Sequence, residues 1–207
     1  FIIPMSGRMI HDESGEINFQ PYGQRDNEVI YSISRSKLNM ELMNLAEGTG
    51  NISIYFNHRL LKANLETKEL TFKKKTVSFD RVFGCDGSGS VLRDEIIKKT
   101  KANFIQKPLG HGYKELSIPA TKANEFRINN NALHIWPRGN FMMIALPNLD
   151  KTFTATLFMP MNGEISFDTI KTQKQIEDFF KNYFIDFFEL MPNLLEDFNK
   201  NPVGSLA

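Results

Sequence analysis

Residues that could support hydrolytic or metal-dependent chemistry are few and far apart in this sequence. The histidines His11, His58, His111 and His134 do not stand at metal-ligand spacing, and Cys85 has no second thiol to pair with. The sequence has neither a Gly-Lys-Ser/Thr phosphate loop nor a Gly-x-Ser-x-Gly nucleophile turn. We therefore expect each histidine to be a packed or surface residue, and common hydrolase chemistry is disfavoured.

One glycine-rich stretch is the best candidate for ligand binding. Asp86-Gly87-Ser88-Gly89-Ser90 follows a short apolar run and precedes a helical pattern that begins near Val91. Glycines let a backbone approach a ligand closely, and the free amides at a helix start favour anions. The same pattern is equally typical of a structural turn between a strand and a helix, so both interpretations stay open at this point.

The surrounding residues carry a more specific signal. Asp86-Gly87-x-x-Ser90-x-x-Arg93 resembles the DG motif of the single-component flavin-dependent aromatic hydroxylases. The resemblance extends over about residues 1 to 160 and narrows to the branch that hydroxylates L-kynurenine. The similar blocks include Pro21-Tyr22-Gly23, Ser32-Ile33-Ser34-Arg35, Phe56-Asn57-His58-Arg59-Leu60, His111-Gly112-Tyr113, Leu133 to Arg138, Phe141 to Asn148 and Thr156 to Pro160.

The first half of the chain is predicted to form several strands and two helices. Extended runs flank the turn at residues 12–16, a strand at 29–33 follows, and Ser34 can cap a helix that ends at Gly48. Further strands are expected at 52–56, 58–65, 70–72, 77–79 and 82–85, followed by a short helix from Val91. Lys73-Lys74-Lys75 is expected to be a solvated hairpin tip.

The second half predicts an antiparallel meander with a covering helix. Strands are expected at 111–118, 132–136, 141–146 and 153–159, separated by Pro/Gly and Asn/Asp turns. Residues 176–184 place aromatic side chains at helical spacing, which indicates core packing. The fold class is α/β (α+β): a fragment of a flavin-hydroxylase FAD-binding fold plus an antiparallel-sheet domain. With the resemblance, residues 1–30 and 104–207 form a substrate-binding domain and residues 31–103 a partial FAD-binding domain.

The resemblance implies how an aromatic amino acid would bind. Arg8 and Tyr22 match positions that grip the substrate carboxylate, which suits a bidentate guanidinium and a phenol donor. Trp136 and Met143 are expected to be packing residues. The matching ring-pocket positions are Ile30, Leu133, Ile144, Leu146 and Phe158.

The resemblance also implies FAD and NADPH as cofactors, and no general base, because the flavin supplies the oxygen chemistry. The matching cofactor positions are Arg35, Leu60, Asp86 and Val91. A related hydroxylase of another aromatic acid remains an alternative. So does a non-catalytic binding domain that uses the aromatic helix face as its contact surface.

Composition sets the remaining expectations. A formal net charge of +1 gives no field that would recruit nucleic acid. No apolar run reaches the roughly 18 residues of a membrane span, and a single cysteine fits a reducing, cytoplasmic compartment. The sequence does not decide the oligomeric state, so both a monomer and a homodimer stay possible. The opening Phe1-Ile2-Ile3-Pro4 and the closing residues lead us to expect an internal segment of a longer protein.

The sequence lacks two parts that the resemblance associates with the flavin phosphates and ribityl chain: the Gly-x-Gly-x-x-Gly turn and a downstream Gly-Asp segment. We therefore predict that the 207-residue chain by itself binds FAD weakly and hydroxylates no substrate. Fluorescence titration with FAD tests this, and a stoichiometric yellow complex would contradict it.

Overall fold

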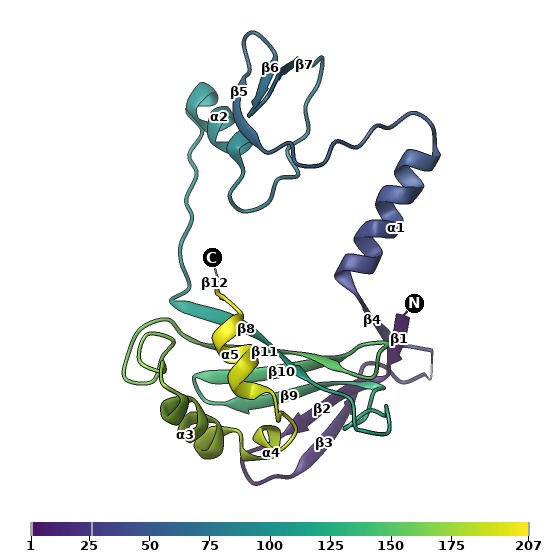
Figure 1. The fold of residues 1–207 in the computed structure, drawn as a ribbon, viewed down its shortest axis with the longest axis vertical. Helices are drawn as coiled ribbons and strands as arrows, with labels where there is room; N and C mark the ends of the chain where they lie inside the picture. The colour runs from purple at the N-terminus through teal and green to yellow at the C-terminus, as the bar shows by residue number, and fades with distance from the viewer. Residues whose placement is uncertain (1, 26, 207) are drawn as a thin grey trace. The chain divides into compact units, whose positions relative to one another are not determined.

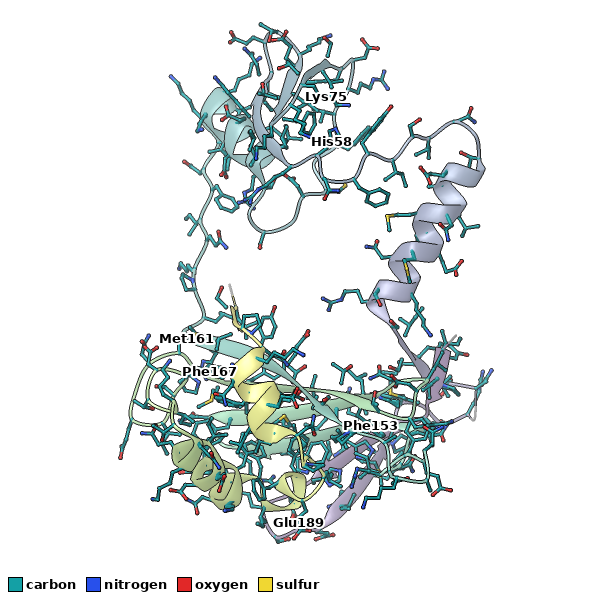
Figure 2. The ribbon with its side chains drawn as sticks, in the orientation of Figure 1. His58, Lys75, Phe153, Met161, Phe167 and Glu189 are labelled. Atoms are coloured by element: carbon teal, nitrogen blue, oxygen red, sulfur yellow. The ribbon has the colours of Figure 1, made fainter. Side chains whose placement is uncertain are left out.

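The computed structural model describes residues 2–25 and 27–206, and the chain divides into two compact units. The larger unit comprises the residues up to Met40 and those from Pro108 onward, and the smaller unit is Glu41–Lys107. Figure 2 shows their side chains, with Phe153 in the larger unit and His58 in the smaller. The division falls inside helix α1 (Arg35–Gly48), which begins after Ser34 as predicted.

The larger unit is a mixed sheet with helices on one face (Figure 1). Its helices are α3 (Gln173–Tyr183), α4 (Ile185–Phe188) and α5 (Leu194–Lys200). Its strands are β1 (Ile2–Met5), β2 (Gly7–His11), β3 (Ile17–Pro21), β4 (Ile30–Ile33), β8 (His111–Ile118), β9 (Ala132–Arg138), β10 (Phe141–Pro147), β11 (Phe153–Pro160) and β12 (Val203–Ser205).

Seven of these strands form one sheet in the order β12-β8-β11-β10-β9-β2-β3, and β1 pairs separately with β4. Every neighbouring pair is antiparallel except β2 and β9, which run parallel. The predicted strands at 111–118, 132–136, 141–146 and 153–159 are confirmed, but the predicted meander order is wrong in one place. Strand β8 pairs with β11 instead of β9, so only β9-β10-β11 is a meander.

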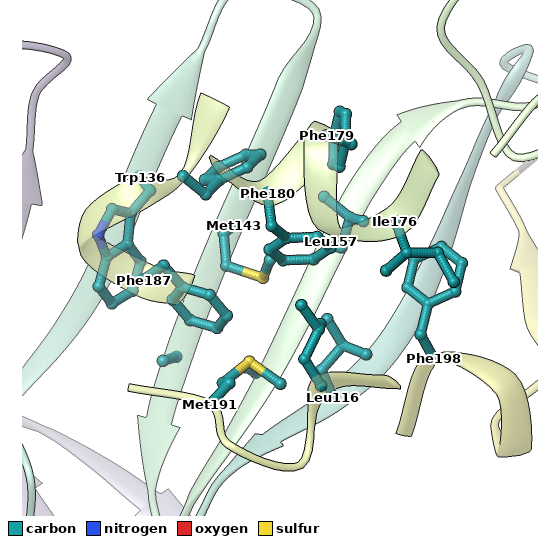
Figure 3. Packing of buried hydrophobic residues seen from close by; sticks show 14 of the residues in the cluster. Leu116, Trp136, Met143, Leu157, Ile176, Phe179, Phe180, Phe187, Met191 and Phe198 are labelled. Carbon is teal, nitrogen blue, oxygen red and sulfur yellow. The ribbon is translucent and has the colours of Figure 1, made fainter. Parts of the chain in front are cut away.

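The core lies between the sheet and the helices. Helix α3 starts at a capping box in which Thr172 and Gln175 bond reciprocally, and it buries Ile176, Phe179 and Phe180. Figure 3 shows these side chains packed against strand residues that include Trp136 and Met143. Phe184 and Phe187 are also fully buried. The aromatic stripe is therefore core, as predicted, and the alternative in which it forms a contact surface is wrong.

The smaller unit contains a three-stranded antiparallel sheet and one further helix. The elements are β5 (Leu60–Asn64), β6 (Glu69–Phe72), β7 (Thr76–Ser78) and α2 (Val91–Thr100). The lysines between β6 and β7 are exposed, as predicted. The strands predicted at 52–56 and 82–85 are not formed, because neither stretch has a ladder partner in the described chain. Among the described residues, no helix combines the length and apolar character needed to cross a bilayer.

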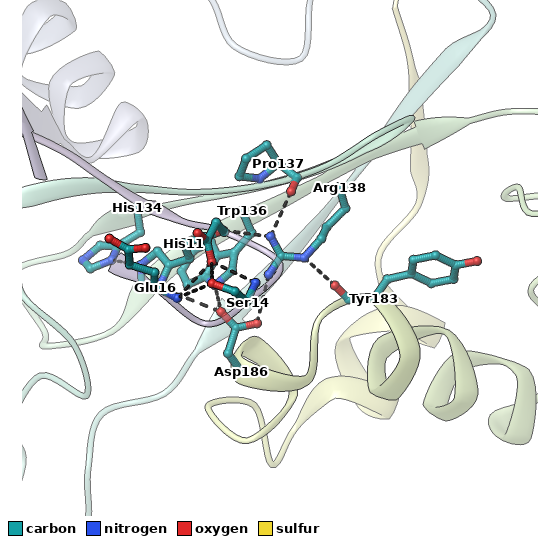
Figure 4. Close-up of polar contacts among 10 residues, drawn as sticks. His11, Ser14, Glu16, His134, Trp136, Pro137, Arg138, Tyr183 and Asp186 are labelled. Carbon is teal, nitrogen blue, oxygen red and sulfur yellow. Dashed lines mark hydrogen bonds and ion pairs between the residues drawn. The ribbon is translucent and has the colours of Figure 1, made fainter. Parts of the chain in front are cut away.

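A polar cluster lies at the edge of the core of the larger unit, with His11, His134 and Arg138 buried and Asp186 partly exposed (Figure 4). The His11 ring stacks on Trp136 with 4.1 Å between centroids, and its Nε2 lies 2.8 Å from Nδ1 of His134. Asp186 on α4 accepts hydrogen bonds from Trp136 Nε1 at 2.7 Å and from an Arg138 terminal nitrogen at 3.3 Å. The cluster thus joins β2, β9 and α4.

The acceptors around the two histidines determine their tautomers. His134 Nε2 lies 2.7 Å from the carbonyl oxygen of Asn129, which can only accept, so His134 carries its hydrogen on Nε2. The neutral ring then accepts at Nδ1, and His11 donates from Nε2. His11 Nδ1 is left 3.9 Å from the Asp186 carboxylate.

Burial lowers the pKa of His11 to about 4, aided by the nearby charges of His134 and Arg138 and opposed by Asp186. Burial also lowers the pKa of His134, against the opposing effect of its bond to Asn129. Both rings are therefore neutral near pH 7.

We predict that this pair makes the chain less stable in mild acid. His11 takes up a proton near pH 6.5 in the unfolded chain but only near pH 4 in the folded chain. The contribution of His11 to the free energy of unfolding is therefore complete above pH 6.5 and is lost as the pH falls to 4. His11 alone accounts for roughly 3 kcal/mol over that window. Urea unfolding at several pH values should show a shallower pH dependence for His11→Gln than for wild type. Asn18→Gln, which removes no titratable group from the exposed strand β3, should keep the wild-type dependence.

Candidate binding site on the open face of the sheet

The strands of the large sheet separate two sets of side chains. Strands β9, β10 and β11 bury every second residue on the helix-covered face, while the intervening residues are half-buried or exposed on the other face. Leu133, Ile144, Leu146 and Phe158 all belong to the half-buried set. Four of the five predicted ring-pocket residues therefore share the face that the helices do not cover, which we call the open face.

Strand β2 places Arg8 at the edge of this wall. Arg8 pairs with Leu133 in the parallel ladder and is exposed. The chain returns after β3, where the Tyr22 amide donates to the Ser6 carbonyl at 3.0 Å. The Arg8 guanidinium carbon lies 5.3 Å from the centre of the Tyr22 ring. The two predicted carboxylate-binding residues are thus brought together, although one lies on a strand and the other in a turn.

Both polar groups lack partners among the described residues. No described side chain forms a salt bridge with Arg8. The Tyr22 hydroxyl is buried and has no hydrogen-bond partner. A buried hydroxyl without a partner is unfavourable by about 1–3 kcal/mol, so its presence here is consistent with a ligand that completes the site.

The remaining predicted pocket residues lie at different depths along the wall. Ile144 pairs with Ile135 in the β9–β10 ladder, one side-chain row beyond Leu133. Phe158 pairs with Met142, one row further on, so it lies farthest from Arg8. Ile30 lies on β4, outside the large sheet, and is 42% exposed. The structure groups Arg8, Tyr22, Leu133, Ile144 and Leu146 more closely than it groups Ile30 or Phe158.

A cavity of about 610 Å³ connects the wall with the start of α1. Arg35, a predicted cofactor residue, and Leu146, a predicted substrate residue, both line it. The Ser32 hydroxyl donates to the Pro147 carbonyl at 2.8 Å and holds β4 beside the end of β10. Arg8 and Tyr22 do not line this cavity, so the predicted carboxylate-binding pair lies outside it.

The cavity also contains residues that sequence reasoning missed, namely Glu115, Asn148 and Thr154. Thr154 is on the same strand face as Phe158, four residues along, so strand alternation could have identified it. Glu115 could not have been identified in this way, because its place beside Thr156 depends on the β8–β11 pairing, which the sequence pattern did not predict.

The other predicted cofactor residues lie in the smaller unit. Asp86 accepts a hydrogen bond from the Ser90 hydroxyl, which lowers the pKa of the Asp86 carboxyl. Ser90 caps helix α2 by accepting from the Arg93 amide at 3.0 Å, and Val91 is the first residue of that helix. Leu60 is the first residue of β5. Within the described chain, no cluster of three or more His, Cys, Asp or Glu residues could hold a metal ion.

Comparison with known proteins gives consistent relatives. No family model matches the chain. Kynurenine 3-monooxygenase from Dictyostelium discoideum is 42% identical over 99% of the chain and 45% of its own length. The enzymes of the same name from Anopheles gambiae and Sus scrofa are 46% and 41% identical over 99% and 97% of the chain, and 43% of their own lengths. The chain spans about half the length of the curated relatives it matches.

Solved structures show a shared fold. HpxO from Klebsiella pneumoniae, complexed with FAD and uric acid, has a TM-score of 0.65 at 15% identity, over 98% of this chain and 51% of that one. PqsL from Pseudomonas aeruginosa, a probable FAD-dependent monooxygenase, has a TM-score of 0.57 at 10% identity, over 77% of this chain and 43% of that one. In sequence, this chain is therefore homologous to one segment of the kynurenine 3-monooxygenases, and it shares the fold of part of HpxO and PqsL.

Proposed function

We propose that a full-length protein containing this chain hydroxylates L-kynurenine to 3-hydroxykynurenine, with FAD and NADPH as cofactors. The chain would supply the carboxylate-binding pair and most of the wall that contacts the ring. The relatives' name supports the substrate and the reaction. The observation that carries the proposal in this chain is the pairing of Arg8 with Tyr22 beside the open face.

The chemistry of the pair suits an amino-acid carboxylate. A guanidinium offers parallel N–H donors to both carboxylate oxygens, and the buried Tyr22 hydroxyl, without a partner in the described chain, can donate to one of them. A charge-assisted hydrogen bond of this kind contributes about 1.5–3 kcal/mol. Because Leu133 lies beside Arg8 in the ladder, a ligand bound by its carboxylate would place its remaining atoms over the apolar wall.

Fixing one end of the substrate also orients its ring. Leu133, Leu146 and Ile144 offer an apolar surface, so the ring is held by desolvation while the carboxylate determines which ring carbon is presented. Phe158, one row beyond Ile144, would bound the far side of the ring, and Ile30 would be a peripheral contact. The wall also excludes water from the reacting edge.

The residues present fit a flavin beside that ring. Arg35 and Leu146 line one cavity of about 610 Å³, so a cationic side chain and part of the apolar wall border the same space. When bound, FAD reduced by NADPH supplies the oxygen-transfer chemistry. Arg35 would approach the anionic parts of the cofactor. Leu60, Asp86 and Val91 stay the proposed cofactor residues of the smaller unit. We assign no proton-transfer residue.

We further propose a cytoplasmic location, no association with nucleic acid, and either a monomeric or a homodimeric state. The single cysteine and the balanced charge support the first two.

The first prediction concerns the guanidinium. In the full-length enzyme, Arg8→Ala should raise KM for L-kynurenine roughly ten- to hundredfold, because a charge-assisted contact is lost. FAD content should stay normal. Steady-state NADPH oxidation measures KM, and Arg25→Ala, at an exposed position nearby, is the matched control. An unchanged KM for Arg8→Ala would remove Arg8 from the site.

The second prediction separates binding from stability. Tyr22→Phe removes only a hydroxyl that has no partner in the described chain, so the free energy of unfolding should stay equal or rise slightly. KM for L-kynurenine should nevertheless increase severalfold. Thermal unfolding and steady-state kinetics on the same preparation check both results. A destabilised variant with normal KM would show that the hydroxyl serves the fold instead.

A further inference from the structure

The β2–β3 hairpin that carries Arg8 has few anchors in the core. All five residues of β3 are exposed, and only Gly7 and His11 are buried in β2. Because Gly7 has no side chain, His11 provides the one buried side chain by which the described hairpin enters the core. Any constraint on the hairpin beyond its backbone ladder therefore depends strongly on the contacts of His11.

Those contacts are made to the neighbouring strand. In the parallel ladder Met9 pairs with His134, so the bond from His11 to His134 runs diagonally between adjacent strands on the buried face. His11 also stacks on Trp136, and Arg138 donates to the His11 carbonyl at 2.7 Å. Three side chains of β9, at alternate positions, thus hold one residue of β2.

This bond joins β2 and β9 in the same register that pairs Arg8 with Leu133. A one-residue slip of β2 along β9 would move every β2 side chain to the opposite face. Arg8 would then point towards the core and lose its position beside Leu133. The lowered pKa of each histidine keeps both rings neutral near pH 7, so the bond is maintained under ordinary conditions.

We propose that the His11–His134 pair is a positioning element for the substrate-binding site, because it sets the register of β2 on β9 and so holds Arg8 beside Leu133. This inference rests on the proposed function. The two histidines lie on the buried face of the sheet and do not touch the substrate. Their substitution should therefore affect only the binding of substrates that carry a carboxylate, because only these substrates use Arg8.

The test uses the full-length enzyme and two substrates, L-kynurenine and its decarboxylated amine analogue. His11→Phe keeps an aromatic ring against Trp136 but cannot donate to His134. We expect KM for L-kynurenine to rise at least fivefold, with kcat within twofold and KM for the analogue unchanged. His11→Gln, whose amide nitrogen can replace Nε2, should stay within twofold of wild type for both substrates.

A matched control separates positioning from general loss of stability. Phe198→Leu weakens the core at α5, away from β2, and should leave both KM values unchanged. The proposal is overturned if His11→Phe raises KM equally for both substrates, or if Phe198→Leu reproduces its effect. Should His11→Phe not fold, His11→Asn, whose side chain is too short to reach His134, is judged by the same criteria.

A second measurement does not depend on the activity. Hydrogen exchange of the backbone amides of residues 7–11 in the full-length protein should accelerate at least fivefold in His11→Phe, relative to those of residues 141–147. If the wild-type enzyme shows no L-kynurenine-dependent NADPH oxidation, the proposed function fails, and the exchange result still decides the role of the pair. Unchanged exchange at residues 7–11 would overturn it.

Discussion

The parallel pairing of β2 with β9 is the constraint on which the larger unit depends. Among the described strands it is the one parallel contact in a sheet that is otherwise antiparallel, and it joins segments more than a hundred residues apart in the chain. Without it, the hairpin that carries Arg8 would have no fixed relation to the strands that form the apolar wall. The cost in chain entropy of closing so long a loop must be met by contacts at the junction itself.

The two faces of the sheet have different roles: one forms the core and the other stays partly open. Their side chains alternate along the same strands. One face buries Trp136, Met143 and their neighbours under the aromatic residues of α3 and α4. The other presents a partly covered apolar surface with one cationic side chain at its edge. On the covered face, Lys114 binds the end of α5. Its buried ammonium donates hydrogen bonds to the carbonyls of Phe198 and Asn201 at 2.8 and 2.6 Å.

The local sequence pattern was sufficient to predict most helices and strands, but it did not show which distant strands pair with one another. Strand alternation correctly placed Ile144 and Leu146 on one face, and helical spacing correctly assigned the aromatic residues near 180 to the core. The stretches at 52–56 and 82–85 have strand-like composition, but a strand also needs a partner, which composition does not specify. The His11–His134 bond was invisible for the same reason, because each histidine was judged without the strand that would lie beside it.

Alternation along the strands also has a consequence for how such a site can change over generations. Substitutions at positions 133, 144 or 146 alter the half-buried apolar surface of the open face, while the residues between them continue to secure the core. A changed open surface and retained foldability can therefore be acquired almost separately.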